Sequence, residues 1–173
     1  NMEPRYALDD AAWIWHPALA DKAAGLVLFR LEWMQARAET VTLQVSADLV
    51  YTLALDGALI GRGPDSGDVA CWSASAYEIK LQPGRRRLEA LVWWAQPPVA
   101  PVGRATWRGG FACAGVGAAA AGFTTGKAKW RAARLAGVAW GPALPGFYHV
   151  IGGAAAMDVA QLAPENAVWA EPK

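Results

Sequence analysis

Apolar and polar residues alternate along several short stretches of the chain, and this alternation predicts β-strands. In residues 40–46, Val41, Leu43 and Val45 fall on one face, and threonine, glutamine and serine residues fall on the other. The end of the stretch 25–33 alternates in the same way. Because successive side chains of a strand point to opposite faces, this pattern indicates strands with one buried and one polar face.

Two sequences between alternating stretches favour tight turns. Asp56-Gly57 follows the alternating residues 51–55, and aspartate and glycine tolerate the positive φ angles that a two-residue hairpin turn needs. Gln82-Pro83-Gly84 lies between residues 77–81 and residues 88–94, which both alternate. The pattern therefore predicts two β-hairpins.

The remaining chain is predicted to form loops and further short strands. Glycine, proline and aspartate fill residues 61–68, which we expect to form an irregular surface loop. Further strands are expected at 111–121, 129–131 and 146–151. No long stretch has the apolar periodicity of an amphipathic helix, so the crossover helices of a parallel sheet are missing.

Eight or nine short strands joined by tight turns predict an all-β fold, an antiparallel β-sandwich or jelly roll. We expect a single domain over residues 13–163. Residues 1–12 are interpreted as a tag remnant and lead-in, because Asn1 precedes the initiator-like Met2. Residues 164–173 are interpreted as a linker that leaves the domain.

The composition agrees with a folded domain and argues against two classes of partner. Of the 173 residues, 54% are hydrophobic and 18% are charged, unlike a disordered chain. A formal net charge of +1 provides no field of one sign, so we expect neither nucleic acid nor membrane as a partner. No export signal follows Met2, which favours a cytoplasmic location.

Few side chains are suited to catalysis. The chain has two histidines, His16 and His149, and no nucleophile or metalloprotease motif, so we expect no enzyme activity from it. Cys71 and Cys113 lack the spacing of zinc ligands and are expected to be buried free thiols. We therefore expect no cofactor, with calcium as the one alternative.

That alternative rests on Asp65 and Asp68, a close pair of carboxylates in the loop 61–68. Both lie on one segment, whereas the catalytic carboxylates of glycosidases face each other across the scissile bond, roughly 5 to 10 Å apart. Turn residues that cap their own backbone are the first interpretation. Oxygen ligands for a calcium ion are the second, since calcium recruits several oxygens from one loop.

Ten tryptophans are many for a chain of this size, and each offers a wide apolar face for a core or a ligand. Sugar recognition combines such a platform with charged groups that bond hydroxyls. The candidate sugar-binding residues are Trp72, Arg62, Asp65, Trp107 and Arg104. Packing in the core or against another domain is the other interpretation, and the more common use of tryptophan.

Six segments carry a family resemblance. They are Trp13-Ile14-Trp15, Phe29-Arg30, Ser46-Ala47-Asp48, residues 51–57, Gly61-Arg62-Gly63-Pro64 and residues 77–84. In this order they resemble the N-terminal β-sandwich domain of bacterial α-L-rhamnosidases, glycoside hydrolase family 78. The resemblance implies a galactose-binding-domain-like jelly roll. The family's catalytic carboxylates lie in an (α/α)6 barrel that has no counterpart here, so no catalytic residue is carried over.

The resemblance implies a non-catalytic accessory domain of a rhamnosidase-like glycoside hydrolase. Its expected partner is the catalytic (α/α)6-barrel domain of the parent chain, reached through the linker at residues 164–173. We expect it to position that domain and to contact a rhamnose-containing saccharide through Trp72, Arg62 and Asp65. A purely structural packing module without a ligand is the alternative, and a stand-alone enzyme is a third hypothesis.

Overall fold

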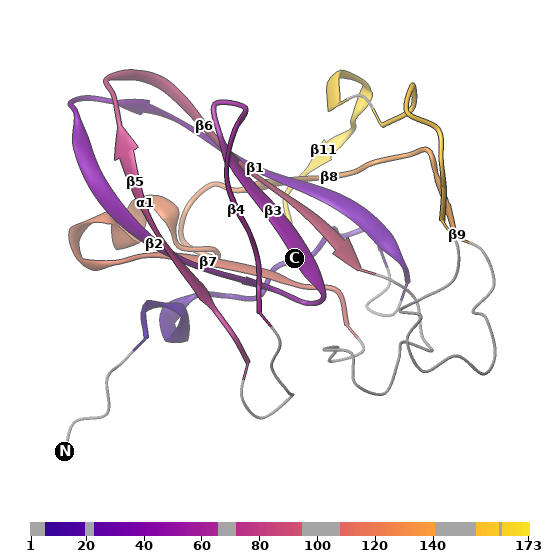
Figure 1. Cartoon of the computed structure of the whole chain (residues 1–173), viewed down its shortest axis with the longest axis horizontal. Coiled ribbons are helices and arrows are strands. Elements are labelled where there is room, and N and C mark those ends of the chain that lie inside the picture. The colour runs from indigo at the N-terminus through magenta and orange to yellow at the C-terminus, as the bar shows by residue number, and fades with distance from the viewer. Residues whose placement is uncertain (1–5, 20–22, 66–71, 95–107, 141–154, 163) are drawn as a thin grey trace.

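The computed structural model describes residues 6–19, 23–65, 72–94, 108–140, 155–162 and 164–173 (Figure 1). The strands in these residues are β1 (Gly25–Gln35), β2 (Glu39–Ala47), β3 (Val50–Leu55), β4 (Ala58–Gly63), β5 (Ser75–Leu81), β6 (Gly84–Trp94), β7 (Phe111–Gly115), β8 (Arg131–Arg134), β9 (Val138–Trp140), β10 (Ala155–Met157) and β11 (Trp169–Ala170). The helical turns are η1 (Ala7–Asp10), η2 (Gly117–Ala119), α1 (Ala120–Phe123) and η3 (Pro164–Asn166). Among the described residues, no helix is long and apolar enough to cross a membrane.

Two antiparallel sheets form the layers of a sandwich, which confirms the predicted all-β fold (Figure 1). One sheet has six strands in the order β11-β8-β1-β6-β3-β4, and the other has three in the order β5-β2-β7. β9 and β10 pair separately as a two-stranded ribbon. Each large sheet has an apolar inner face, so stacking the two sheets removes both faces from water.

The core lies between the two sheets. Val41, Leu43 and Val45 of β2 are buried, as their alternation predicted. Phe29 of β1 stacks on Phe111 of β7 with ring centroids 4.9 Å apart, so an aromatic pair joins the two layers. Such pairs add roughly 0.5–1.5 kcal/mol beyond the burial of their surface.

A second, smaller apolar cluster covers the outer face of the six-stranded sheet. Leu26 and Leu28 point away from the core and pack with Leu135 and the half-buried Trp169. Both faces of this part of β1 are therefore covered, which explains why residues 26–29 are apolar without alternation.

One predicted hairpin is confirmed and the other is wrong. β3 and β4 pair around Asp56 and Gly57, whose φ angles are 50° and 85°. β5 and β6, by contrast, belong to different sheets, because β5 pairs with β2 while β6 pairs with β1 and β3. The turn at Gln82-Pro83-Gly84 therefore carries the chain from one layer to the other.

Three predicted boundaries also differ. The irregular loop expected at 61–68 begins only at Pro64, because residues up to Gly63 still belong to β4. The strand expected at 111–121 ends at Gly115, where the chain turns into η2 with Gly117 at a φ of 65°. The strand expected at 129–131 lies at Arg131–Arg134, and the one expected at 146–151 falls outside the described residues.

The C-terminal tail was predicted to be a linker, but its described residues pack on the domain. β11 pairs with β8 at the edge of the six-stranded sheet. Lys173 and Trp15 exchange two backbone hydrogen bonds of 2.8 and 3.0 Å. Such paired backbone is part of the folded domain, so residues 169–173 do not behave as a free linker.

Candidate functional site

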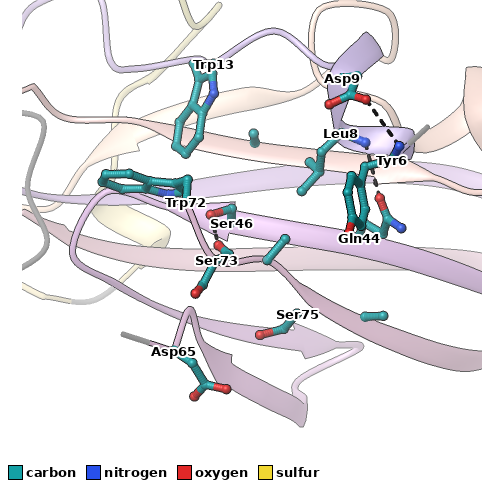
Figure 2. A pocket seen from close by; sticks show the side chains of 13 residues that line it. Tyr6, Leu8, Asp9, Trp13, Gln44, Ser46, Asp65, Trp72, Ser73 and Ser75 are labelled. Atoms are coloured by element: carbon teal, nitrogen blue, oxygen red, sulfur yellow. Dashed lines mark hydrogen bonds between the residues drawn. The ribbon is translucent and has the colours of Figure 1, made fainter. Parts of the chain in front are cut away.

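A cavity of about 500 Å³ lies on the outer face of the three-stranded sheet. Its lining comes from η1 and the segment that follows it, from β2 and β7, from Asp65 just beyond the end of β4, and from the entry to β5 (Figure 2). This volume lies within the range of small-molecule sites, roughly 300–1,000 Å³. We therefore take this pocket as the candidate site.

The floor of the pocket consists of small residues on neighbouring strands. Ser46 of β2 is directly opposite Ala112 of β7, and Gln44 of β2 is opposite Ala76 of β5. The larger residues of β2 alternate onto the inner face, so the outer face at this end carries little side-chain volume. The hollow therefore follows from which residues occupy the outward positions.

One wall of the pocket is aromatic. The rings of Trp13 and Trp72 meet edge to face, with centroids 5.8 Å apart and planes at 89° (Figure 2). The two residues are far apart in the sequence and come from different segments. Edge-to-face contact is a favoured geometry of aromatic pairs, and it leaves a corner of aromatic surface at the pocket.

Backbone pairing along β7 places Trp13. The next residue, Ile14, exchanges two backbone hydrogen bonds with Phe111, of 2.9 and 3.0 Å. On the other side of Trp13, the carbonyl oxygen of Ala12 accepts a hydrogen bond of 2.6 Å from the hydroxyl of the fully buried Thr125. Gly110 lies against the Trp13 ring, where a Cβ atom would stand 2.8 Å from Cε3.

The buried Ser46 holds the segment that carries Trp72. Its hydroxyl donates a 2.7 Å hydrogen bond to the carbonyl oxygen of Ser73 (Figure 2). The indole N–H of Trp72 is covered and has no acceptor within the described part of the chain. A buried donor without an acceptor costs roughly 1–3 kcal/mol, and such donors occur at sites that a ligand or water completes.

The helical turn η1 forms the opposite wall with Tyr6, Leu8 and Asp9. The side-chain oxygen of Gln44 accepts a 3.3 Å hydrogen bond from the Leu8 N–H, which ties η1 to the sheet. Asp9 accepts a 3.2 Å hydrogen bond from the Tyr6 N–H, and this contact closes the turn. Figure 2 shows Asp9 and Asp65 on opposite sides of the pocket.

The described groups whose pKa is shifted, His16, Tyr51 and Cys113, do not line this pocket, although Tyr51 bonds the pocket residue Ser75. Burial raises the pKa of the Cys113 thiol far above its ordinary value, so this free cysteine stays protonated and unreactive. Burial, and then the charge of Arg134, lower the pKa of His16. Within the described residues, no group of three or more His, Cys, Asp or Glu side chains is arranged to hold a metal ion.

The structure brings together two of the residues proposed from the sequence. Trp72 and Asp65 both line the pocket, whereas the exposed Arg62 on β4 does not. Trp107, Arg104 and Asp68 lie outside the described residues. The calcium site at Asp65 and Asp68 therefore remains a prediction.

Sequence reasoning missed several lining residues, which are Trp13, Tyr6, Asp9 and the serines Ser46, Ser73 and Ser75. Trp13 was not among the candidate sugar-binding residues, but its ring lines the pocket and half of its surface is exposed. The small polar residues Ser46, Ser73 and Ser75 were the available signal, since short side chains leave room for a hollow on the sheet.

The arginines at 85–87 are ion-paired. Arg86 and the backbone N–H of Arg87 both bind the carboxylate of Asp56, each at 2.8 Å. Arg85 contacts Glu32 at 3.3 Å. Of these side chains, Arg86 faces the turn between β3 and β4, and none of the three lines the candidate pocket.

The fold is similar to parts of a rhamnosidase and of a lectin. No family model and no curated protein matches the chain. The GH78 family rhamnosidase of Bacillus sp. GL1 matches over 95% of this chain and 18% of that chain, with a TM-score of 0.71 and 26% identity. The Pleurotus ostreatus lectin in complex with GalNAc matches over 72% of this chain and 35% of the lectin, with a TM-score of 0.51 and 23% identity. The apo form of the lectin matches over 94% of this chain and 40% of the lectin, with a TM-score of 0.54 and 20% identity.

The chain thus spans less than half the length of each of these proteins. The likeness to the lectin is one of fold, because fewer than a quarter of the aligned residues are identical. The likeness to the rhamnosidase covers nearly all of this chain and a minor part of that enzyme. The sandwich therefore resembles one domain-sized part of a glycoside hydrolase.

Proposed function

We propose that this chain is a non-catalytic accessory domain of a rhamnosidase-like glycoside hydrolase, and that its pocket binds a saccharide. The observation that carries the proposal is the match of 95% of the chain to 18% of a rhamnosidase. A unit that recurs as a minor part of a long hydrolase is expected to support the part that performs hydrolysis, although fold alone does not assign function.

The pocket supports the binding role through its chemistry. Trp13 and Trp72 offer apolar surface for the C–H faces of a sugar ring, and Asp65 and the hydroxyls of the half-buried Ser73 and Ser75 offer hydrogen-bond partners for its hydroxyl groups. A pocket of mainly apolar surface with a few polar groups is typical of small-molecule sites. A rhamnose-containing saccharide is the ligand that the resemblance to the rhamnosidase suggests.

The same pocket is poorly suited to hydrolysis. The carboxylates among its described lining residues, Asp9 and Asp65, are both exposed. The general acid of a glycosidase needs surroundings that raise its pKa, so that it still holds a proton near neutral pH. We therefore expect binding without turnover, and we expect the isolated domain to release no product from an aryl rhamnoside.

A packing role is the second candidate, and it has its own supporting observation. Val50 of β3 and Trp93 of β6 are opposite one another on the outer face of the six-stranded sheet, and they are 50% and 37% exposed. Neighbouring apolar groups on a sheet face suit contact with another domain. The partner proposed is the catalytic helical domain of the parent chain.

Tryptophan fluorescence during titration with L-rhamnose and rhamnosyl oligosaccharides, with and without calcium, tests the binding role. We expect a saturable change at millimolar sugar in the native domain and none in Trp72→Ala. Trp93→Ala, on the other sheet, is the matched control and should bind as the native domain does. No change in the native domain at millimolar sugar, in either condition, would leave only the packing role.

A further inference from the structure

The charges around the pocket indicate which sugars it accepts. Of the described lining residues, Asp9 and Asp65 are the acidic ones, and no lysine, arginine or histidine is among them. This imbalance is local, because the whole chain carries 16 basic and 15 acidic residues. The pocket is therefore a negative region on a nearly neutral molecule.

The two carboxylates flank the space that a ligand would occupy. Asp9 belongs to η1, and Asp65 follows the end of β4 on the other side of the pocket (Figure 2). A ligand carboxylate placed between them would meet like charge from both sides. Sugar hydroxyls or an ammonium group would instead donate hydrogen bonds to either carboxylate.

The exposed Arg62, three residues before Asp65, does not line the pocket, and three other described arginines are ion-paired with residues outside it. Arg85 is paired with Glu32 of β1, and Arg86 is paired with Asp56 at the β3–β4 turn. Arg30 pairs with Glu89 at 2.8 Å and lies over the Trp169 ring at 4.1 Å, on the outer face of the other sheet. These three cations are committed to contacts away from the pocket.

We infer that the pocket selects neutral or amino sugars and discriminates against uronates and sulfated sugars. This inference rests on the proposed function, since it concerns the ligand class of the same pocket. Interactions between exposed charges are screened by salt, with a Debye length of about 10 Å at 0.1 M, so the discrimination should weaken as salt is added.

The test uses three matched disaccharides that share a rhamnosyl unit and carry glucose, glucuronate or glucosamine as the second sugar. At low salt we expect the glucuronate compound to bind the native domain at least about tenfold more weakly than the glucosamine compound. The double variant Asp9→Asn/Asp65→Asn should bring the two affinities to within about twofold. Glu78→Gln removes an exposed carboxylate of β5 that does not line the pocket, and it should keep the native discrimination.

The outcomes separate this inference from the function on which it rests. Binding of the glucose compound together with equal or tighter binding of the glucuronate compound would overturn the charge selection and leave the sugar site standing. Discrimination that persists in the double variant would also overturn it. Failure of all three compounds to bind would overturn both the sugar site and its selectivity. Circular dichroism of each variant establishes that the fold is retained.

Discussion

Glycines that lie against aromatic rings shape the molecule at the scale of single residues. A Cβ atom on Gly61 would stand 2.3 Å from the Tyr77 ring, so this position of β4 accepts no side chain without displacing the tyrosine. The Tyr77 hydroxyl in turn lies 3.0 Å from the hydroxyl of Tyr51, and Tyr51 lies in the core. Gly110 has the same relation to Trp13 at the pocket.

Replacing Gly110 with alanine should therefore disturb the pocket more than the fold. Its added methyl group would stand 2.8 Å from Trp13, and the half-exposed ring can move outward to relieve the contact. We expect sugar affinity in the fluorescence titration to fall by about threefold or more, since displaced aromatic contacts are worth roughly 0.5–1.5 kcal/mol.

Gly122→Ala is the matched control, because a methyl group there would meet open space. Its sugar affinity should equal that of the native domain. If Gly110→Ala binds sugar as the native domain does, Trp13 does not contribute to the site.

At the scale of elements, one side chain connects the tip of the β3–β4 hairpin to β6. The carboxylate of Asp56 accepts hydrogen bonds from Arg86 and from the backbone N–H of Arg87, and the Asp56 N–H donates to the Arg87 carbonyl oxygen at 2.8 Å. The same residue has a φ of 50°, which aspartate and asparagine tolerate better than most residues. Asp56 therefore stabilises both the β3–β4 turn and the contact of this turn with β6.

Asp56→Ala should destabilise the domain by about 1–3 kcal/mol, because it removes two acceptors and places alanine at a positive φ. Asp56→Asn should cost less, since its side-chain oxygen can still accept from the Arg87 N–H. Urea denaturation followed by tryptophan fluorescence measures both changes. Equal stability of the alanine variant and the native domain would show that the hairpin tip is not held in this way.

At the scale of the whole molecule, the C-terminal residues complete the six-stranded sheet. Trp169 of β11 covers the outer apolar cluster with Leu28, and Arg30 lies over its ring. Lys173 is bonded to the backbone of Trp15 near the start of the described chain. The edge of the sheet and the N-terminal segment that carries Trp13 therefore depend on these residues.

Truncation after Leu162 should lower the free energy of unfolding by about 3 kcal/mol or more, by loss of a packed tryptophan and an edge strand. Val168→Ser is the control, since that side chain is 83% exposed and should change stability by less than about 0.5 kcal/mol. Chemical denaturation compares the three proteins. A truncated domain as stable as the native one would restore the linker interpretation.

The stability of the whole domain should also depend on the protonation of His16. This side chain is buried, its Nδ1 accepts a 3.2 Å hydrogen bond from the Ala18 N–H, and burial with the nearby Arg134 charge lowers its pKa below 6.5. The unfolded chain therefore binds a proton more readily than the folded one, and stability present above pH 6.5 is lost as the pH falls through the folded-state pKa.

We expect the free energy of unfolding to decline between pH 7.5 and 5 more steeply in the native domain than in His16→Gln. Urea denaturation at each pH gives the comparison, and the carboxylates and His149 contribute equally to both proteins. Parallel pH profiles would contradict the role of His16.

Local patterns determined much of the fold and part of the site. Alternation identified the buried face of β2, and Asp56-Gly57 identified the β3–β4 turn, because strand faces and tight turns depend on residues close in sequence. Trp72 and Asp65 were proposed together because Asp65 lies in the predicted loop 61–68 and Trp72 closely follows that loop. These features need no knowledge of the rest of the chain.

Tertiary structure alone decided which strands share a sheet and which residues share the pocket. β5 and β6 have the sequence pattern of a hairpin, yet they do not pair with each other. β5 pairs with β2 in one sheet, and β6 pairs with β1 and β3 in the other. Residues 169–170 are too few for alternation to predict a strand, and they form one because they pair with β8. Trp13 meets Trp72 only because Ile14 pairs with Phe111. Strand pairing and burial depend on contacts between residues that are distant in the sequence. The alternation of apolar and polar residues within one strand does not specify these contacts.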